Sequence, residues 1–164
     1  MKVLFIGDIV GNPGRRAAKE MIAVLKKNLS IDFCIANCEN SAGGSGITYV
    51  VAQELYKIGI DAITMGNHTW SKKEITNFID SDSKIARPAN YPPDIPGKGS
   101  VIISGSCGKI GVVNVLGRVY MENVDCPFRA VDKEIEYLKN YVKVVIVDMH
   151  AEATSEKQAL AWYL

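Results

Sequence analysis

The sequence predicts an α/β fold with a largely parallel sheet, flanking helices and one β-hairpin. Within residues 1–79, apolar runs typical of buried strands alternate three times with segments of helical spacing. This alternation is the pattern of parallel strands joined by right-handed crossovers. Farther along, residues 100–104 and 109–116 form two apolar runs separated by a short turn containing Gly105 and Gly108, which predicts the hairpin.

Each element follows from the spacing of apolar residues and from the residues at its ends. The strands outside the hairpin are expected at residues 2–7, 32–38, 61–65 and 142–149. The helices are expected at residues 15–29, 48–58, 71–79 and 130–141, with a last helix opening at Thr154. Residues 11–14 are expected to form a loop, and residues 87–97 hold four of the six prolines and are expected to be irregular. Thr48 is the predicted N-cap of the second helix, and Thr154 with Glu156 forms a capping signature.

Composition limits the class of protein and its partners. A chain of 164 residues with 48% hydrophobic and 23% charged residues is expected to form one globular domain, residues 1–164. The net charge of +1 gives no strong signal for nucleic-acid binding. No apolar run approaches the ~20 residues of a membrane span, and the first eight residues are too short for a signal peptide. We therefore expect no membrane partner, a cytoplasmic protein and four reduced cysteines.

Polar side chains follow four of the expected parallel strands at the point where each strand ends. They are Asp8, then Glu39 and Asn40, then Asn67 and His68, and finally His150. If these strands are neighbours, their carboxyl ends bring the side chains to one edge of the sheet, where ligands bind in α/β folds. A mixed set of oxygen and nitrogen donors suits Mn, Fe(II), Zn or Ni better than Ca or Mg. The alternative is that each residue separately caps a strand end, with Asn67 forming an Asx turn.

These blocks resemble those of calcineurin-like metallophosphoesterases. The resemblance rests on residues 7–11, on Glu39 with Asn40, on residues 66–68 and on the strand-ending His150. The chain departs from the common pattern in three places. No histidine follows Asp8 in the first block, Glu39 and Asn40 stand where Gly-Asp is usual, and Thr69 stands where an acid usually follows the histidine.

These departures are themselves similar to one bacterial branch, the YmdB-like phosphodiesterases, which are grouped with 2′,3′-cyclic-nucleotide phosphodiesterase activity. The likeness covers essentially the whole chain, with its longest blocks at residues 61–73, 87–90, 125–129 and 148–157. It implies a metallophosphoesterase-like sandwich that hydrolyses phosphodiesters, with 2′,3′-cyclic nucleotides as the expected substrates.

The resemblance also implies roles for the strand-end residues. The metal ligands would be Asp8, Glu39, Asn40, Asn67 and His150. They would hold two divalent transition metal ions of the Fe, Mn or Zn class, with Glu39 bridging them. A metal-bound hydroxide would attack phosphorus, and His68 would act as general acid on the leaving oxygen. No substrate-binding residue is assigned, because Arg87, Arg118 and Arg129 all lie near loops and the sequence does not choose among them.

The family is longer and carries a later G-x-H-x-H block with two more histidine ligands. This chain has only two histidines, so we expect a domain that is incomplete at its C-terminus, binds two metals weakly and is a poor enzyme alone. Two other functions remain open. One is a regulatory or RNA-associated binding protein on the same fold, and the other is a phosphomonoesterase. The sequence also leaves a homo-oligomer open.

Overall fold

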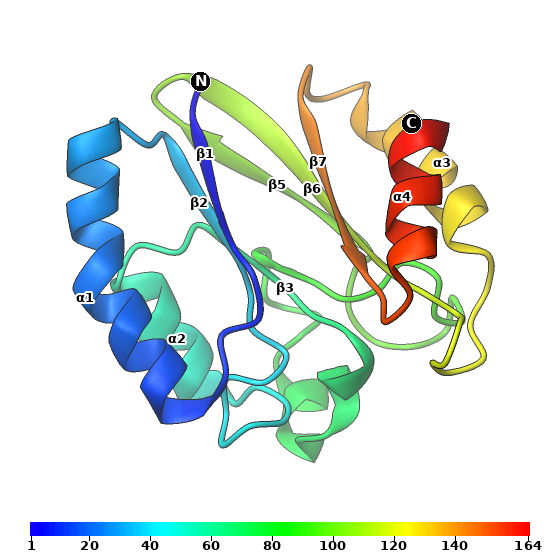
Figure 1. Ribbon diagram of the computed structural model, residues 1–164, viewed down its shortest axis with the longest axis horizontal. Helices are drawn as coiled ribbons and strands as arrows, with labels where there is room; N and C mark the ends of the chain where they lie inside the picture. Colours follow the sequence, from blue (N-terminus) through cyan, green and yellow to red (C-terminus); the bar gives the residue numbers. More distant parts are fainter.

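The computed structural model describes residues 1–164, which form two β-sheets stacked face to face (Figure 1). The first sheet is parallel with the order β1-β2-β3-β4, and the second has the order β5-β6-β7. The strands of the first sheet are β1 (Val3–Ile6), β2 (Phe33–Asn37), β3 (Ala62–Thr64) and β4 (Ile85–Ala86). Those of the second are β5 (Ser100–Gly105), β6 (Gly108–Leu116) and β7 (Val145–His150). The hairpin prediction is confirmed, because β5 and β6 pair in antiparallel register, and β7 pairs with β6 in parallel.

Helices cover the outer face of each sheet. They are α1 (Gly11–Leu29), α2 (Tyr49–Lys57), α3 (Pro127–Leu138) and α4 (Thr154–Tyr163). Figure 1 shows α1 and α2 beside the first sheet and α3 and α4 beside the second. None of these helices has both the length and the apolar character needed to cross a lipid bilayer.

Strand β2 shows why two sheets stack here. Its side chains alternate between its two faces, and all of them are buried. Cys34 and Ala36 belong to the core that the first sheet shares with α1 and α2, whereas Phe33 and Ile35 pack between the two sheets. A strand that is apolar on both faces needs a layer on each side. The chain therefore has four layers, helix, sheet, sheet and helix, which confirms the predicted α/β sandwich.

Two elements predicted within the first 79 residues are wrong. Helix α1 begins at Gly11, so residues 11–14 are helical and not a loop. Pro13 lies in the first turn, where a helix needs no backbone donor. The helix expected at residues 71–79 is only a short 3-10 helix, Lys73–Asn77, and another 3-10 helix, Asn67–Trp70, forms the turn before it. The backbone N–H of His68 is already bonded to the side chain of Glu39, so this turn is shaped by the neighbouring strand end.

Other differences concern element ends. Helix α3 begins at Pro127, earlier than expected, and β7 begins at Val145, later than expected, and includes His150. The capping signature of α4 is wrong, because the N-cap is Ala153 and no side chain caps it. Glu156 instead accepts hydrogen bonds from the backbone of Arg118 and Val119. The two-residue strand β4 was not predicted, since its length is below what periodicity detects.

Helix α2 provides a stability test of the confirmed cap. Thr48 accepts a hydrogen bond from the N–H of Val51 at 3.3 Å. Thr48→Ala is expected to lower the free energy of unfolding by about 1 kcal/mol, because that donor loses its partner. Urea unfolding would measure the change. Thr154→Ala is the matched control, since the side chain of Thr154 caps no helix, and an equal loss in both variants would contradict the capping role.

Candidate active site

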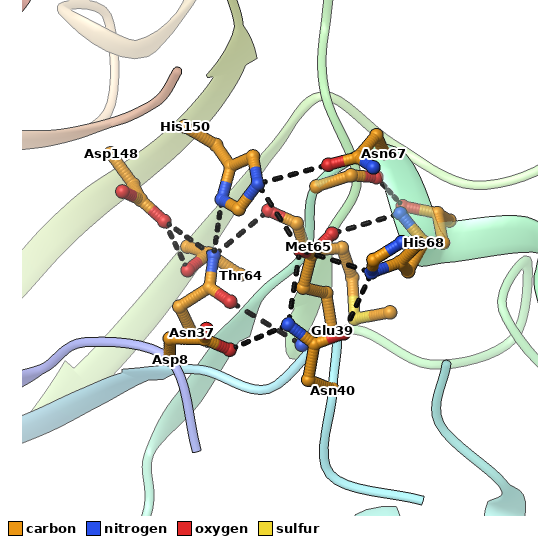
Figure 2. Close-up of polar contacts among 12 residues, drawn as sticks. Asp8, Asn37, Glu39, Asn40, Thr64, Met65, Asn67, His68, Asp148 and His150 are labelled. Atoms are coloured by element: carbon orange, nitrogen blue, oxygen red, sulfur yellow. Dashed lines mark hydrogen bonds and ion pairs between the residues drawn. The ribbon is translucent and has the colours of Figure 1, made fainter. Parts of the chain in front are cut away.

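The six side chains singled out in the sequence lie together at the carboxyl ends of the strands (Figure 2). They are Asp8, Glu39, Asn40, Asn67, His68 and His150. One detail of the prediction is wrong. His150 ends β7 of the second sheet, so the site lies where the edges of two stacked sheets meet and not along one sheet.

Glu39 is the centre of this cluster. Its side chain is only 3% exposed and lies between the two imidazoles (Figure 2). Oε1 lies 3.1 Å from His150 Nε2 and 3.5 Å from His68 Nδ1. Oε2 accepts the backbone N–H of His68 at 2.9 Å. One buried carboxylate therefore contacts both histidines of the chain.

The same contacts shift the ionisation of Glu39 and His150. Burial alone would raise the pKa of Glu39, but the hydrogen bonds from His150 and from the His68 backbone hold that pKa below its ordinary value. Burial alone would lower the pKa of His150, but the hydrogen bond to Glu39 and its charge raise that pKa. A proton on His150 and a negative charge on Glu39 therefore stabilise each other in the absence of a metal.

The remaining members fall on either side of Glu39. The oxygen Oδ1 of Asn67 lies 3.2 Å from His150 Nε2. On the other side, Asn40 donates from Nδ2 to Asp8 Oδ1 at 2.9 Å and to Glu39 Oε1 at 3.3 Å. The oxygen of Asn40 lies 2.7 Å from His68 Nδ1. All six predicted residues are thus joined by direct contacts.

Gly66 allows this close assembly. A Cβ atom on Gly66 would lie 2.6 Å from His150 Nε2 and closer still to Glu39 Oε2, far inside van der Waals contact. The turn leaving β3 therefore requires glycine for reasons of space, since its φ of −164° is open to any residue. The backbone at Gly66 forms one wall of the cluster.

A buried polar network lies beneath the cluster, and the sequence reasoning missed it. Asp148 of β7 accepts hydrogen bonds from Thr64 Oγ1 at 2.5 Å and from Asn37 Nδ2 at 3.1 Å, which links the two sheets. Burial raises the pKa of Asp148. Asn37 Nδ2 also lies 3.4 Å from His150 Nδ1. The signal was present in the sequence, because Asp148 is a charged residue that follows three apolar residues within β7.

On one side of Glu39, the two distances from His150 to its neighbouring oxygen atoms fit a divalent metal ion without any rearrangement. Two atoms bound to one ion at about 2.1 Å lie about 3.0–3.4 Å apart in octahedral or tetrahedral geometry. The atoms Glu39 Oε1 and Asn67 Oδ1 lie at 3.1 Å and 3.2 Å from His150 Nε2. No group of three or more His, Cys, Asp and Glu side chains is placed to hold an ion, so the asparagine oxygen is needed to complete this donor set.

The other side fits only after one amide turns over. Asn40 presents its NH₂ group to Asp8 and Glu39, and an NH₂ group is no metal ligand. A half rotation of the amide would place its oxygen between the two carboxylates. The same rotation would place Nδ2 opposite His68 Nδ1.

The structure separates the three arginines that the sequence left open. The guanidinium of Arg87 is buried and donates to three carbonyl groups, those of Pro88, Ile95 and Pro96. It therefore holds the proline-rich loop. Arg87 and Arg129 both line a cavity of about 440 Å³, and Arg118 is exposed at the start of the loop after β6.

Comparison with known proteins gives a consistent result. Residues 4–164 match the family described as YmdB-like protein. The chain is 45% identical over 163 residues to the 2′,3′-cyclic-nucleotide 2′-phosphodiesterase of Bacillus subtilis (strain 168), which covers 99% of this chain and 62% of that protein. The chain spans 58% to 62% of the length of the curated relatives that it matches.

Two solved structures are similar over nearly the whole chain. A hypothetical protein from Thermus thermophilus has a TM-score of 0.90 and 40% identity, with 100% of this chain and 63% of that chain covered. A novel phosphatase from Mycoplasma pneumoniae has a TM-score of 0.89 and 33% identity, with 99% and 59% covered. These matches confirm the fold class predicted from the sequence.

Proposed function

Because the chain belongs to the YmdB-like protein family, we propose that it forms the site-bearing part of a metal-dependent phosphodiesterase. The observation that carries the proposal is the contact of Glu39 with both His68 and His150 at the joined edges of two sheets. The substrate that we propose is a 2′,3′-cyclic nucleotide. The name of the Bacillus subtilis relative supports this choice.

We assign the five predicted ligands to two donor groups that share Glu39. One group is His150, Asn67 and Glu39, and the other is Asp8, Asn40 and Glu39. When bound, divalent ions supply Lewis-acid stabilisation of the phosphoryl charge and activation of water. The neutral amide oxygens of Asn67 and Asn40 add ligands without adding negative charge, which keeps the site attractive to a phosphodiester.

His68 is positioned to protonate the leaving oxygen. Its Nδ1 atom faces Asn40 and Glu39, so Nε2 is the nitrogen left to face a substrate. When the Asn40 amide turns to offer its oxygen as a ligand, Nδ2 donates to His68 Nδ1 and the ring proton stays on Nε2. That proton is then available to the leaving alkoxide, while His68 itself holds no metal.

A substrate panel tests the proposal against its two rivals. The metal-loaded, natural full-length protein would be assayed with 2′,3′-cyclic AMP, bis-p-nitrophenyl phosphate and p-nitrophenyl phosphate. Hydrolysis of the two diesters is expected. Activity on the monoester alone would establish a phosphomonoesterase, and no activity with a fully loaded site would favour the regulatory or RNA-associated binding protein.

The affinity for metal is expected to rise with pH. His150 has a raised pKa, so it keeps its proton to higher pH than an ordinary histidine, and a metal ion must displace that proton. The ion pair with Glu39 stabilises the metal-free fold below the ordinary imidazole pKa, and this contribution is lost as pH rises through the raised value. Mn²⁺ affinity should therefore increase between about pH 6 and pH 8.

Titration calorimetry with Mn²⁺ at several pH values, in buffers of different ionisation enthalpy, would show the proton release. The His68→Ala variant is the control and should show the same slope. An affinity that does not change with pH would contradict the assignment of His150 as a ligand.

A further inference from the structure

The loop that joins β6 to α3, residues 117–126, begins at the rim of the candidate active site. Leu116, the last residue of β6, is paired in register with His150. The N–H of the next residue, Gly117, donates to the carbonyl oxygen of His150 at 2.8 Å. The loop therefore starts beside His150, a proposed metal ligand.

Tyr120 projects from this loop in an unusual way. Its side chain is 92% exposed, and its φ of +61° lies in the left-handed region. That conformation costs an L-residue roughly 1 kcal/mol or more, so it persists only where the surrounding backbone is held. Tyr120 lies in a turn that is closed by the hydrogen bond from the N–H of Met121 to the carbonyl oxygen of Arg118. This turn accounts for the backbone conformation but not for the exposed ring.

The backbone is held on both sides of Tyr120. Before it, the carboxylate of Glu156 in α4 accepts the N–H of Arg118 at 2.9 Å and that of Val119 at 3.1 Å. After it, Glu122 accepts the hydroxyl proton of Tyr91 at 2.9 Å. The loop is thus anchored to neighbouring elements, and the ring of Tyr120 is presented from a fixed support.

The position of Tyr120 suits contact with the part of the substrate that lies beyond the phosphate. Tyr120 is three positions after Gly117, so their Cα atoms lie within about 11 Å of each other even if the chain is fully extended. A phosphate at the cluster leaves the sugar and the base of a nucleotide to extend outward from it. An exposed aromatic ring on a fixed loop offers a face on which a base can stack.

We propose that Tyr120 is a specificity-determining residue that stacks on the base of a nucleotide substrate. This inference rests on the proposed function and deepens it. The substrate class is a phosphodiester that carries a nucleobase, and base-free phosphodiesters are poorer substrates because they leave the ring of Tyr120 in water.

The test compares a substrate with a base and one without it. The metal-loaded, full-length protein would be assayed with 2′,3′-cyclic AMP and with glycerol 1,2-cyclic phosphate. Tyr120→Ala is expected to raise KM for the nucleotide at least about fivefold, at the lower end of the effect of losing one aromatic–base stack. The value of kcat for the nucleotide and both constants for the base-free substrate should stay within about twofold. Tyr120→Trp should restore the KM, since a larger ring also stacks.

Tyr141→Ala is the matched control, because Tyr141 is also an exposed tyrosine and lies beyond the end of α3. An unchanged KM in Tyr120→Ala, with an active wild type, would overturn the inference and leave the proposed function in place. An equal rise in KM for both substrates would also overturn it, because Tyr120 would then support the structure of the loop and would not recognise the base.

If the wild type hydrolyses neither substrate, the proposed function fails and a binding measurement decides the inference. Adenosine 2′-monophosphate and ribose 5-phosphate would be titrated into the wild type and into Tyr120→Ala. A loss of affinity for the adenosine ligand alone supports stacking. Equal affinities of the two proteins for both ligands would overturn it.

Discussion

His68→Ala in the full-length protein is expected to lower kcat by about 10²- to 10⁴-fold, which is the usual contribution of a general acid. The metal content should stay at the wild-type level. The physical reason is the division of contacts around Glu39. His68 reaches the cluster through Nδ1, while its Nε2 has no partner within the protein. Elemental composition and turnover would be measured on the same preparation.

His150→Ala is the contrasting variant, because His150 is a proposed ligand. It should lose metal as well as activity, and it leaves Glu39 without its 3.1 Å partner. A full metal content in His150→Ala would show that His150 is not a ligand. An unchanged kcat in His68→Ala would show that His68 is not the general acid.

Gly66→Ala is expected to have an effect as large, although it changes no functional group. The new Cβ would overlap Glu39 Oε2 and the ring of His150, so both must move. Displacing a supporting or ligating group typically costs 10- to 100-fold in metal affinity, and a shift of about 1 Å in a reacting group can cost about 10²-fold in rate. Metal affinity and kcat should therefore fall together, by about 10²-fold each.

Gly7→Ala is the control for a glycine in the neighbouring strand turn, because a Cβ at Gly7 meets no atom within 4 Å. It should retain both metal and activity. A Gly66→Ala variant with wild-type metal content would mean that the turn leaving β3 can yield, and that the close packing at Gly66 does not position Glu39.

The sequence predicted the fold and the closeness of the six polar side chains because both follow from local patterns. Apolar periodicity located each long element, and the position after each strand located the polar residues. Periodicity failed where a long-range contact decides the local structure. The backbone N–H of His68 bonds to Glu39, and the turn there is a 3-10 helix that the apolar spacing did not predict. Glu156 looked like a helix cap, but it anchors a loop that lies far away in the sequence.

The sequence also could not show which sheet His150 joins. The strand that ends at this residue carries the same apolar pattern as the strands of the first sheet, and pairing with β6 is a tertiary choice. For the same reason, the network of Asp148 with Asn37 and Thr64 was invisible until the two sheets were placed face to face.

This division of the site between two sheets bears on when the protein can acquire metal during synthesis. Four of the five proposed ligands lie in the first 67 residues, but His150 arrives only with β7, more than 80 residues later. The contact between Thr64 and Asp148 that fixes the sheets together spans 84 residues of chain. A nascent chain that has completed only its first sheet therefore lacks a full donor set. Metal uptake through His150 would then mark molecules whose two layers have already docked.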